Sequence, residues 1–428
     1  MLFSSKPQPL FDTYASFLGL NATSYEAEHT SILNYLKRFE PGIPAKDDYF
    51  HVREFLRSYA GWETTFKAYR TQVERLLLWS WIKEGRSILS LRRQDAEAFL
   101  AFSQEPDEDW VGTSVRRRFI LKDGSMEPNP LWRPFGIQGD KASRKLAVET
   151  GDDDDTTPER YEMAQGTLKQ VFAICSSFYD YLNDQDVLVG NPFRAIKQKS
   201  RFFQKKAKAV SGKVLDRLQW EFVIETAEWM AAEEPEKHER TLFIIATLFS
   251  LYLRISELSG RPGWSPTMDA FQKDPDGSWW YVAIGKGNKE RRISVSDDML
   301  VYLKRYRAFR NLTPLPYAGD PAPLLTKHNG QGGLTDRQIR NLVQECFDTA
   351  LVRMKQEGRS EDEVSNLRAA SAHWLRHTSA TYDAPSRPLK HLQEDLGHAK
   401  ASTTQDIYYN AINQERAASG KQRRLKDQ

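Results

Sequence analysis

The sequence predicts a mainly α-helical protein with a small antiparallel β-sheet, an α+β fold in two domains. Three observations lead to this prediction. Apolar residues recur at helical spacing over most of the chain, and one stretch, 278–295, places apolar and β-branched runs around a glycine-rich tetrapeptide. A lysine- and arginine-rich tract interrupts the pattern at 194–213. With 428 residues the chain is long enough for two domains with separate cores.

The first half is predicted to be a series of helices with one insertion. Helical patterns cover Glu26–Phe39, 47–103 and Pro158–Leu182. Between 110 and 158 several prolines and glycines and a run of four aspartates indicate an inserted loop with room for a hairpin. We therefore expect a helical domain over 1–195, with the insertion at about 110–158.

The second half is predicted to begin after a basic linker at 196–213 and to fill 214–428, ending in a C-terminal tail. Glu221–Ala232 and His238–Leu253 show helical periodicity, and 278–295 indicates a β-hairpin. Thr335 followed by Gln338 forms a capping box that opens a helix to about Gln356. Short helices are expected from 370 to 418.

Composition excludes some classes of protein. Hydrophobic residues make up 40% of the chain and charged residues 28%, which excludes a largely disordered protein. The net charge of +3 predicts no partner by itself. The tract 194–213, however, holds eight Lys and Arg residues and no Asp or Glu. Such a segment is typical either of a polyanion binder or of a solvated linker.

Cysteine usage and hydropathy predict a cytoplasmic protein with no membrane partner. The two cysteines, Cys175 and Cys346, lie far apart in no metal-like spacing, which fits a reducing compartment. The longest apolar stretch, Leu242–Leu253, is shorter than the ~20 residues that span a bilayer. The N-terminal sequence shows no pattern of a secretory signal.

Two strings in the second half carry basic residues in defined settings. Arg254 stands in Leu-Arg-Ile-Ser-Glu-Leu at the end of an apolar helix, where burying an arginine requires a partner. The plainer interpretation is an ion pair with Glu257. Lys286 lies in Gly-Lys-Gly-Asn-Lys-Glu-Arg at the predicted hairpin tip. Taken alone, such a lysine is more often a solvated turn residue.

Two further strings carry histidines and tyrosines. His373 and Arg376 are three residues apart and share one helix face, so a guanidinium and an imidazole together suit a phosphodiester. Arginine cannot ligate a metal, so the pair is a poor metal site. The last string contains Leu-Gly-His at His398 and Thr-Thr-Gln-Asp-Ile-Tyr-Tyr ending at Tyr409. A lone histidine or tyrosine pair of this kind is usually core or surface.

In this order the four strings LRISEL, GKGNKER, HWLRHTSAT and LGHAKASTTQDIYY resemble the tyrosine recombinase (phage integrase) family. The resemblance is strongest over 238–412 and extends more weakly to 160–182 and Gly190-Asn191-Pro192. It implies an N-terminal helical core-binding domain that clamps DNA and a C-terminal catalytic domain. The implied activity is site-specific DNA strand cleavage and transfer for integration, excision or transposition of a mobile element.

The resemblance also implies a role for each residue of the four strings. Tyr408 would attack the scissile phosphate and form a 3′-phosphotyrosine, with Tyr409 as the alternative nucleophile. Arg254 and Arg376 would clamp that phosphate. Lys286 would be the general acid, and His373 would act as a base toward the tyrosine. His398 would hydrogen-bond the phosphate, and Glu257 would orient the arginines. No metal and no cofactor is expected.

The implied partner is double-stranded DNA, bound by a homo-oligomer that is a dimer on one site and a tetramer in the synaptic complex. Candidate phosphate-binding residues lie in the linker and on one N-terminal helix: Lys197, Lys199, Arg201, Lys205, Lys206, Lys67, Arg70 and Arg75. The insertion would contact extra DNA or a partner, or be a passive loop. The tail would dock on a neighbouring protomer or fray.

Three other functions remain open at the level of sequence. A DNA-relaxing or hairpin-forming relative would use the same chemistry on one duplex. A catalytically silent DNA-binding protein could keep the scaffold, although the intact set of six groups argues against it. A metal-dependent nuclease built on the histidines would lose its activity with a chelator.

Overall fold

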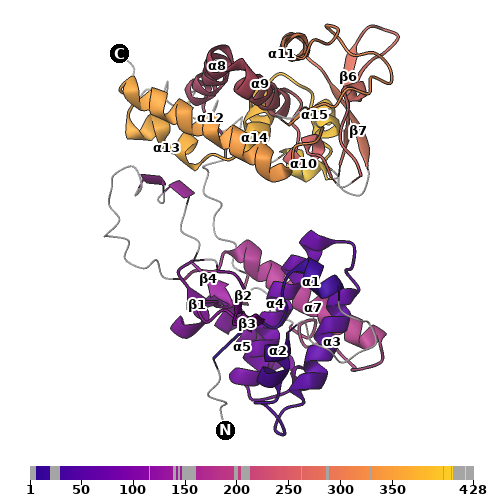
Figure 1. Cartoon of the computed structure of the whole chain (residues 1–428), viewed down its shortest axis with the longest axis vertical. Helices are drawn as coiled ribbons and strands as arrows, with labels where there is room; N and C mark the ends of the chain where they lie inside the picture. The colour runs from indigo at the N-terminus through magenta and orange to yellow at the C-terminus, as the bar shows by residue number, and fades with distance from the viewer. Residues whose placement is uncertain are drawn as a thin grey trace. The chain divides into compact units, whose positions relative to one another are not determined.

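The computed structural model describes the chain as two compact units (Figure 1). The units are Met1–Asp140 with Ala147–Ala207, and Lys141–Leu146 with Lys208–Gln428. Each unit has a hydrophobic core of its own. The residues described are 6–19, 29–114, 116–137, 141–142, 145–146, 161–196, 201–203, 213–261, 263–285, 289–327, 330, 332–398, 400–405, 407 and 420.

The first unit is mainly helical. Its helices are α1 (Tyr14–Leu18), α2 (Thr30–Leu36), α3 (Ala45–Arg57), α4 (Glu63–Ile82), α5 (Arg93–Gln104) and α7 (Gln165–Asp184). Helices α3, α4 and α7 pack on one another around buried aromatic rings. The polar ends of these rings are satisfied inside the core, because the Trp81 indole donates to Asp48 at 2.8 Å and the Tyr179 hydroxyl to the Ile88 carbonyl at 2.7 Å.

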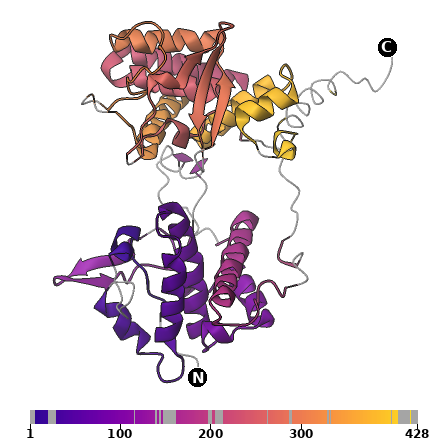
Figure 2. The same cartoon turned by 90° about the vertical axis from the view of Figure 1, so that its right-hand side faces the viewer.

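The insertion contains the predicted hairpin and a second pairing that was not predicted. Strands β2 (Phe119–Lys122) and β3 (Ser125–Pro128) pair antiparallel, and Asp123 and Gly124 between them both have positive φ, as a tight hairpin turn requires. In Figure 2 this hairpin projects from the helices of the first unit. Strands β1 (Val111–Gly112) and β4 (Phe135–Gly136) pair in parallel.

Helix α7 begins later than predicted. The helical pattern predicts a start at Pro158, but 161–164 are not helical and α7 begins at Gln165. Ala164 has a ψ of 141°, so the chain enters the helix from an extended conformation. Residues 147–160, including the aspartate run, lie outside the described residues.

The second unit combines helices with the predicted small sheet. Its helices are α8 (Arg217–Glu233), α9 (Pro235–Ser250), α10 (Ile255–Leu258), α11 (Asp297–Phe309), α12 (Asp336–Gln356), α13 (Glu361–Ala369), α14 (Ala372–Asp383) and α15 (Leu389–Leu396). Its strands are β5 (Phe271–Lys273), β6 (Trp279–Ile284) and β7 (Glu290–Ser294), antiparallel in the order β5-β6-β7. The predicted hairpin is confirmed as β6–β7, whereas β5, α11 and α13 were not predicted.

Local sequence signals fix several helix ends of this unit. The Thr335–Gln338 capping box opens α12 as predicted, and Asp216 and Gln219 form another at α8. Helix α9 was predicted to reach Leu253 but ends at Ser250, because Tyr252 takes a left-handed conformation with a φ of 49°. The chain therefore turns before Arg254. In Figure 1, β6, β7, α10 and α15 lie together at one end of the unit.

A short part of the insertion groups with the second unit. Lys141 donates to the Gln344 side chain on α12 at 2.6 Å and to the Ala370 carbonyl, and Lys145 pairs with Asp348 one turn further along α12. Burial and the charge of Lys145 lower the pKa of Lys141 to about 8. These contacts join Lys141 and Lys145 to α12, and the role of the insertion stays a prediction.

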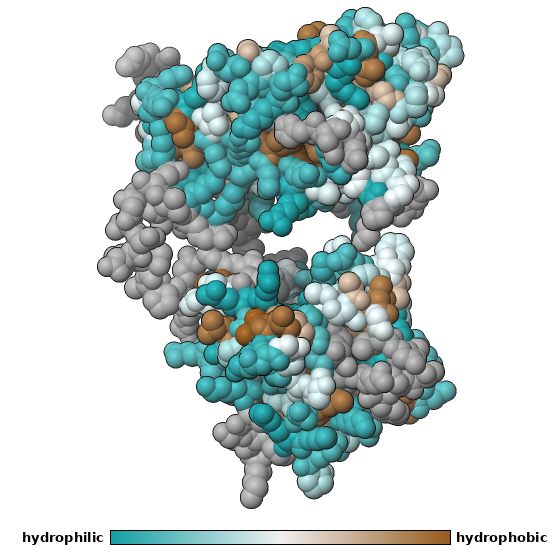
Figure 3. All heavy atoms as spheres, viewed as in Figure 1, coloured by the Kyte–Doolittle hydropathy of each residue, from teal (hydrophilic) through white to brown (hydrophobic). Residues whose placement is uncertain are grey.

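Both cysteines are buried, Cys175 in the core of the first unit and Cys346 in that of the second. Burial raises the pKa of both thiols. On the face shown in Figure 3 the surface of each unit is mostly hydrophilic, with small separate hydrophobic spots. In the described part of the chain, no helix combines the length and apolar character that crossing a bilayer requires.

Candidate active site

Arg254 is held at the start of α10 by a buried carboxylate. Its backbone N–H donates to Glu257 Oε2 at 2.8 Å, and its guanidinium donates to Glu257 Oε1 at 3.1 Å. The Glu257 side chain is 0% exposed, whereas that of Arg254 is 42% exposed. The ion pair predicted as the plainer alternative therefore exists, and it orients a guanidinium whose outer part remains open to a ligand.

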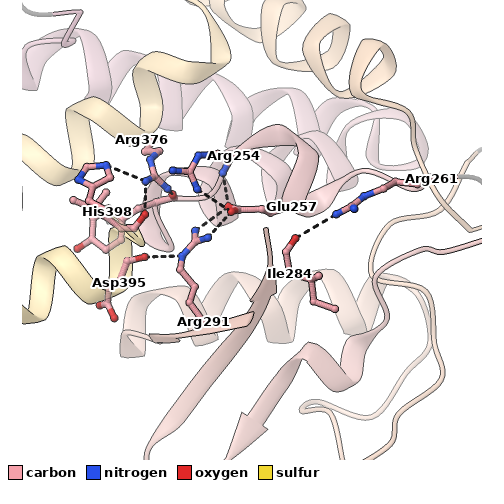
Figure 4. A network of polar contacts seen from close by, with 10 residues as sticks. Arg254, Glu257, Arg261, Ile284, Arg291, Arg376, Asp395 and His398 are labelled. Carbon is pink, nitrogen blue, oxygen red and sulfur yellow. Dashed lines mark hydrogen bonds and ion pairs between the residues drawn. The ribbon is translucent and has the colours of Figure 1, made fainter. Parts of the chain in front are cut away.

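Arg291 on β7 is a second partner of Glu257, and the sequence analysis missed it (Figure 4). Its guanidinium donates to both carboxylate oxygens, with Nη2 at 2.8 Å from Oε2. Its Nε donates to the Asp395 carbonyl at 2.9 Å. Burial raises the pKa of Glu257, but the hydrogen bonds and charges of Arg291 and Arg254 outweigh it, so the pKa is lowered overall. The carboxylate therefore stays ionised between two arginines.

Arg376 on α14 is buried, with 3% exposure, and its hydrogen bonds go to groups without negative charge. Its two Nη atoms donate to the carbonyls of Tyr252 and Leu396, and Nη2 lies 3.3 Å from His398 Nε2. Burial and the charges of Arg254 and Arg291 lower the pKa of Arg376 to about 9, although Glu257 opposes the shift. A buried cation in such surroundings attracts an anion.

Burial and neighbouring positive charge favour the neutral form of His373 and His398. His398 follows α15 and its Nδ1 lies 3.0 Å from the Thr404 hydroxyl. Burial and the charge of Arg376 lower the pKa of His398 to about 4. His373 has a lowered pKa from burial and from Arg376, and its Nε2 is hydrogen-bonded to His377 Nε2 at 3.0 Å. Neutral imidazoles can accept or donate a proton at the site.

His373 and Arg254 also face a common cavity of about 480 Å³. Ser256, Arg340 and Asn341 are among its other lining residues. The structure thus brings together five of the predicted residues from α10, α14 and the end of α15: Arg254, Glu257, His373, Arg376 and His398. Arg291 is the last residue of the GKGNKER string, but nothing in the sequence indicates that it pairs with Glu257.

Several predicted residues lie outside the part of the chain that the structure describes. These are the proposed general acid, both candidate nucleophiles and most of the linker cations: Lys286, Tyr408, Tyr409, Lys197, Lys199, Lys205 and Lys206. Their roles stay predictions. Among the described residues no group of three or more His, Cys, Asp or Glu side chains could hold a metal ion.

The described DNA-binding candidates all belong to the first unit. Lys67 is exposed and pairs with Glu63 at 2.6 Å, and Arg201 is exposed and lies 3.8 Å from Glu97. Arg70 donates to the Asp12 carbonyl. Arg75 donates to the Pro134 carbonyl at 2.8 Å and stacks over Phe135, so its present contacts hold the insertion. Lys67 and Arg201 are the two that present their charge to solvent most directly.

Gly397 keeps His398 and Arg291 close together. It has a φ of 61°, and a Cβ atom built on it would lie 2.8 Å from Arg291 Cδ. The Arg291 guanidinium is hydrogen-bonded to Glu257 and to the Asp395 carbonyl, so moving the side chain away from a Cβ at 397 would break these hydrogen bonds. The Leu-Gly-His string is thus explained by backbone conformation and by a close approach.

We expect Gly397→Ala to destabilise the second unit more than Gly358→Ala does. Gly358 also has a positive φ, 77°, but a Cβ there would meet nothing within 4 Å, so it isolates the backbone cost of about 1–2 kcal/mol. Thermal unfolding of the two variants measures the difference. Equal unfolding temperatures for the two variants would show that the close contact with Arg291 does not disfavour a side chain at position 397.

Comparison with known proteins identifies this architecture. Residues 225–415 match the phage integrase family, and this part of the chain belongs to that family.

The relatives found are bacterial recombinases. The tyrosine recombinase XerC of Thermodesulfovibrio yellowstonii is 26% identical over 247 residues, which cover 56% of this chain and 69% of the relative. XerC of Myxococcus xanthus is 33% identical over 165 residues, 38% of this chain and 47% of the relative, so the chain spans about half of that protein. The crystal structure of the XerH site-specific recombinase in a post-cleavage complex with a palindromic difH substrate aligns over 90% of this chain and 94% of that chain, with a TM-score of 0.51 and 16% identity. This likeness shows the fold alone.

Proposed function

We propose that the protein is a site-specific DNA recombinase that breaks and rejoins strands through a covalent 3′-phosphotyrosine. The observation that supports this most directly is the convergence of Arg254, Arg291 and Arg376 on a site where Glu257 is the only carboxylate to which these guanidiniums donate, among the described residues. A phosphodiester supplies the missing negative charge. Its non-bridging oxygens would accept from Arg376 and from the open part of Arg254.

The arginines would stabilise the transition state more than the ground state. As the tyrosine oxygen attacks, the phosphorus becomes pentacovalent and charge accumulates on its non-bridging oxygens. Glu257 and Arg291 hold Arg254 in place before the substrate arrives, so little reorganisation is needed during the reaction. To donate a hydrogen bond to the same oxygens, neutral His398 would accept from the Thr404 hydroxyl at Nδ1 and direct its Nε2–H to the phosphate instead of facing Arg376.

The proton and bond changes balance without an external energy source. The Tyr408 oxygen would form a bond to phosphorus, its proton passing to His373, while the bond to the 5′ oxygen breaks and Lys286 protonates that oxygen. A 5′ hydroxyl from a second strand reverses the step and joins new ends. The chain's own side chains suffice for each proton transfer.

The proposed partner is double-stranded DNA, bound by a dimer on one site and a tetramer during exchange, in the cytoplasm. The recombinase relatives, the basic tract 194–213 and the exposed Lys67 and Arg201 support DNA binding. Integration, excision and transposition share this chemistry. The N-terminal unit would act as the core-binding clamp, the tract 196–213 as the linker and 214–428 as the catalytic domain.

The test uses a pool of random-sequence duplexes, each carrying a nick. When cleavage occurs beside the nick, the short fragment with the 5′ hydroxyl diffuses away, and the protein stays bound to the DNA. We expect SDS-resistant protein–DNA adducts that contain phosphotyrosine, and sequencing the trapped DNA gives the preferred site. If the wild-type chain yields no adduct, or cleaves and leaves a free 3′ end, the proposal is wrong.

The recovered site then separates exchange from related activities. Two differently labelled duplexes carrying it should exchange strands, whereas a DNA-relaxing enzyme would reseal each duplex without exchange. Addition of a chelator should leave the adduct yield unchanged, while a metal-dependent nuclease would lose its activity.

A further inference from the structure

Tyr252 occupies a backbone position that tyrosine rarely takes. It follows α9 with a φ of 49°, in the left-handed region where helix ends favour glycine. Its side chain is buried, with 2% exposure. A bulky residue persists in this conformation only when its surroundings hold it there.

The phenol of Tyr252 is held by a polar network from three other elements. Its hydroxyl donates to the Asp383 carboxylate at the end of α14 and accepts from Arg387 Nη1 at 2.8 Å. Arg387 Nη2 in turn donates to Asp395 Oδ2 on α15 at 2.6 Å, and the Ser294 hydroxyl on β7 donates to the same oxygen at 2.9 Å. Burial and the charge of Asp383 raise the pKa of the phenol, so it stays protonated and keeps its donor.

The backbone of the same residue contacts the candidate active site. The Tyr252 carbonyl accepts from Arg376 Nη1, while Arg376 Nη2 donates to the Leu396 carbonyl. These two acceptors define the plane of the guanidinium, since each Nη atom is fixed by one carbonyl. Leu396 belongs to α15, the helix to which Arg387 is tied through Asp395. One network therefore holds both acceptors of Arg376.

We propose that Tyr252 is a positioning residue whose phenol, held by Asp383 and Arg387, fixes the carbonyl that orients Arg376. The inference rests on the proposed function in one respect, that Arg376 acts on the scissile phosphate. Without the phenol contacts the left-handed turn at Tyr252 relaxes. The Arg376 guanidinium then loses the Tyr252 carbonyl as a fixed acceptor and keeps only the Leu396 carbonyl. The segment 383–388, between Arg376 and Leu396 in the chain, supplies both contacts to the phenol.

The first arm of the test needs no DNA. Hydrogen exchange at the Arg376 guanidinium, followed by ¹⁵N NMR and assigned by its loss in Arg376→Lys, should be slow in the wild-type chain. We expect Tyr252→Phe to accelerate it at least about fivefold, since one hydrogen bond of this kind contributes about that factor. The matched control is Tyr302→Phe, which removes a phenol–carboxylate hydrogen bond of 2.8 Å to Glu228 in the same unit. The control should leave the exchange unchanged.

The second arm uses the duplex recovered from the random pool. At saturating DNA we expect Tyr252→Phe to slow adduct formation about tenfold, with the dissociation constant for DNA unchanged and the unfolding midpoint shifted no more than in Tyr302→Phe. In an Arg376→Lys background, Tyr252→Phe should cause no further loss, because both changes act through one group.

The outcomes separate this inference from the proposed function. The inference is wrong if Tyr252→Phe leaves hydrogen exchange at the Arg376 guanidinium unchanged. It is also wrong if the double variant loses cleavage rate by the full product of the two single losses. A rate loss matched by an equal loss of thermal stability in Tyr252→Phe, but not in Tyr302→Phe, also overturns it, since it shows a role in folding only. If the wild-type chain forms no adduct, the proposed function fails, while the exchange arm still decides whether Tyr252 orients Arg376.

Discussion

Tyr408→Phe is expected to abolish the covalent adduct with nicked DNA. The phenylalanine ring keeps the shape of the side chain but has no oxygen to attack phosphorus, and no other group replaces a nucleophile in a transesterification. The measurement is the yield of SDS-resistant protein–DNA adduct on the recovered duplex. DNA binding should persist, because the arginines and the basic tract remain.

Tyr409→Phe is the matched control for this prediction. The sequence predicts short helices up to 418, and adjacent residues on a helix point about 100° apart, so we predict that only one of the two tyrosines faces the phosphate. We expect Tyr409→Phe to form the adduct at close to the wild-type rate. The reverse result would move the nucleophile to Tyr409, and adduct formation by the double variant Tyr408→Phe with Tyr409→Phe would exclude both tyrosines as the nucleophile.

Arg376→Lys is expected to slow adduct formation by about 100- to 1000-fold, the usual effect of removing a donor that stabilises transition-state charge. Lysine retains the positive charge but cannot donate in two fixed directions. The buried carbonyls of Tyr252 and Leu396 would then compete with the phosphate for a single ammonium group. Single-turnover cleavage at saturating DNA measures the rate, and a mobility-shift titration should show little change in affinity.

Arg305→Lys provides the control for a change of arginine to lysine elsewhere in the unit. Arg305 on α11 donates to Glu239 through Nε at 2.9 Å and Nη2 at 2.7 Å, and none of its hydrogen bonds goes to a described residue of the candidate active site. We expect wild-type cleavage from this variant. Wild-type cleavage by Arg376→Lys as well would contradict the assignment of Arg376 as a phosphate clamp.

Much of the fold could be predicted because it is encoded locally. Apolar periodicity marks α4 and α12, the Thr335–Gln338 capping box marks the start of α12, and β-branched and aromatic runs mark β6 and β7. The errors occur where tertiary contacts override local pattern. Helix α9 stops before Leu253 because the phenol of Tyr252 stabilises a left-handed turn that no propensity scale would place at a tyrosine.

The candidate site could be predicted only in part. Arg254, Arg376 and His398 stand in short strings whose order along the chain is informative. Arg291 ends the GKGNKER string, but its partner Glu257 is distant in sequence. Tyr252 stands outside the four strings and acts through contacts to Asp383 and Arg387. Only folding brings these partners together, and their pairing follows no fixed spacing.

The two buried thiols have a practical consequence. Cys175 and Cys346 are the protein's complete set of cysteines, and each lies in the core of a different unit. A maleimide or other alkylating reagent can reach either one only when the surrounding helices open, because a protonated and enclosed sulfur is unreactive. Mass spectrometry of pulse-alkylated protein would therefore measure the rate at which each unit opens, one cysteine reporting on each unit, without any engineered label.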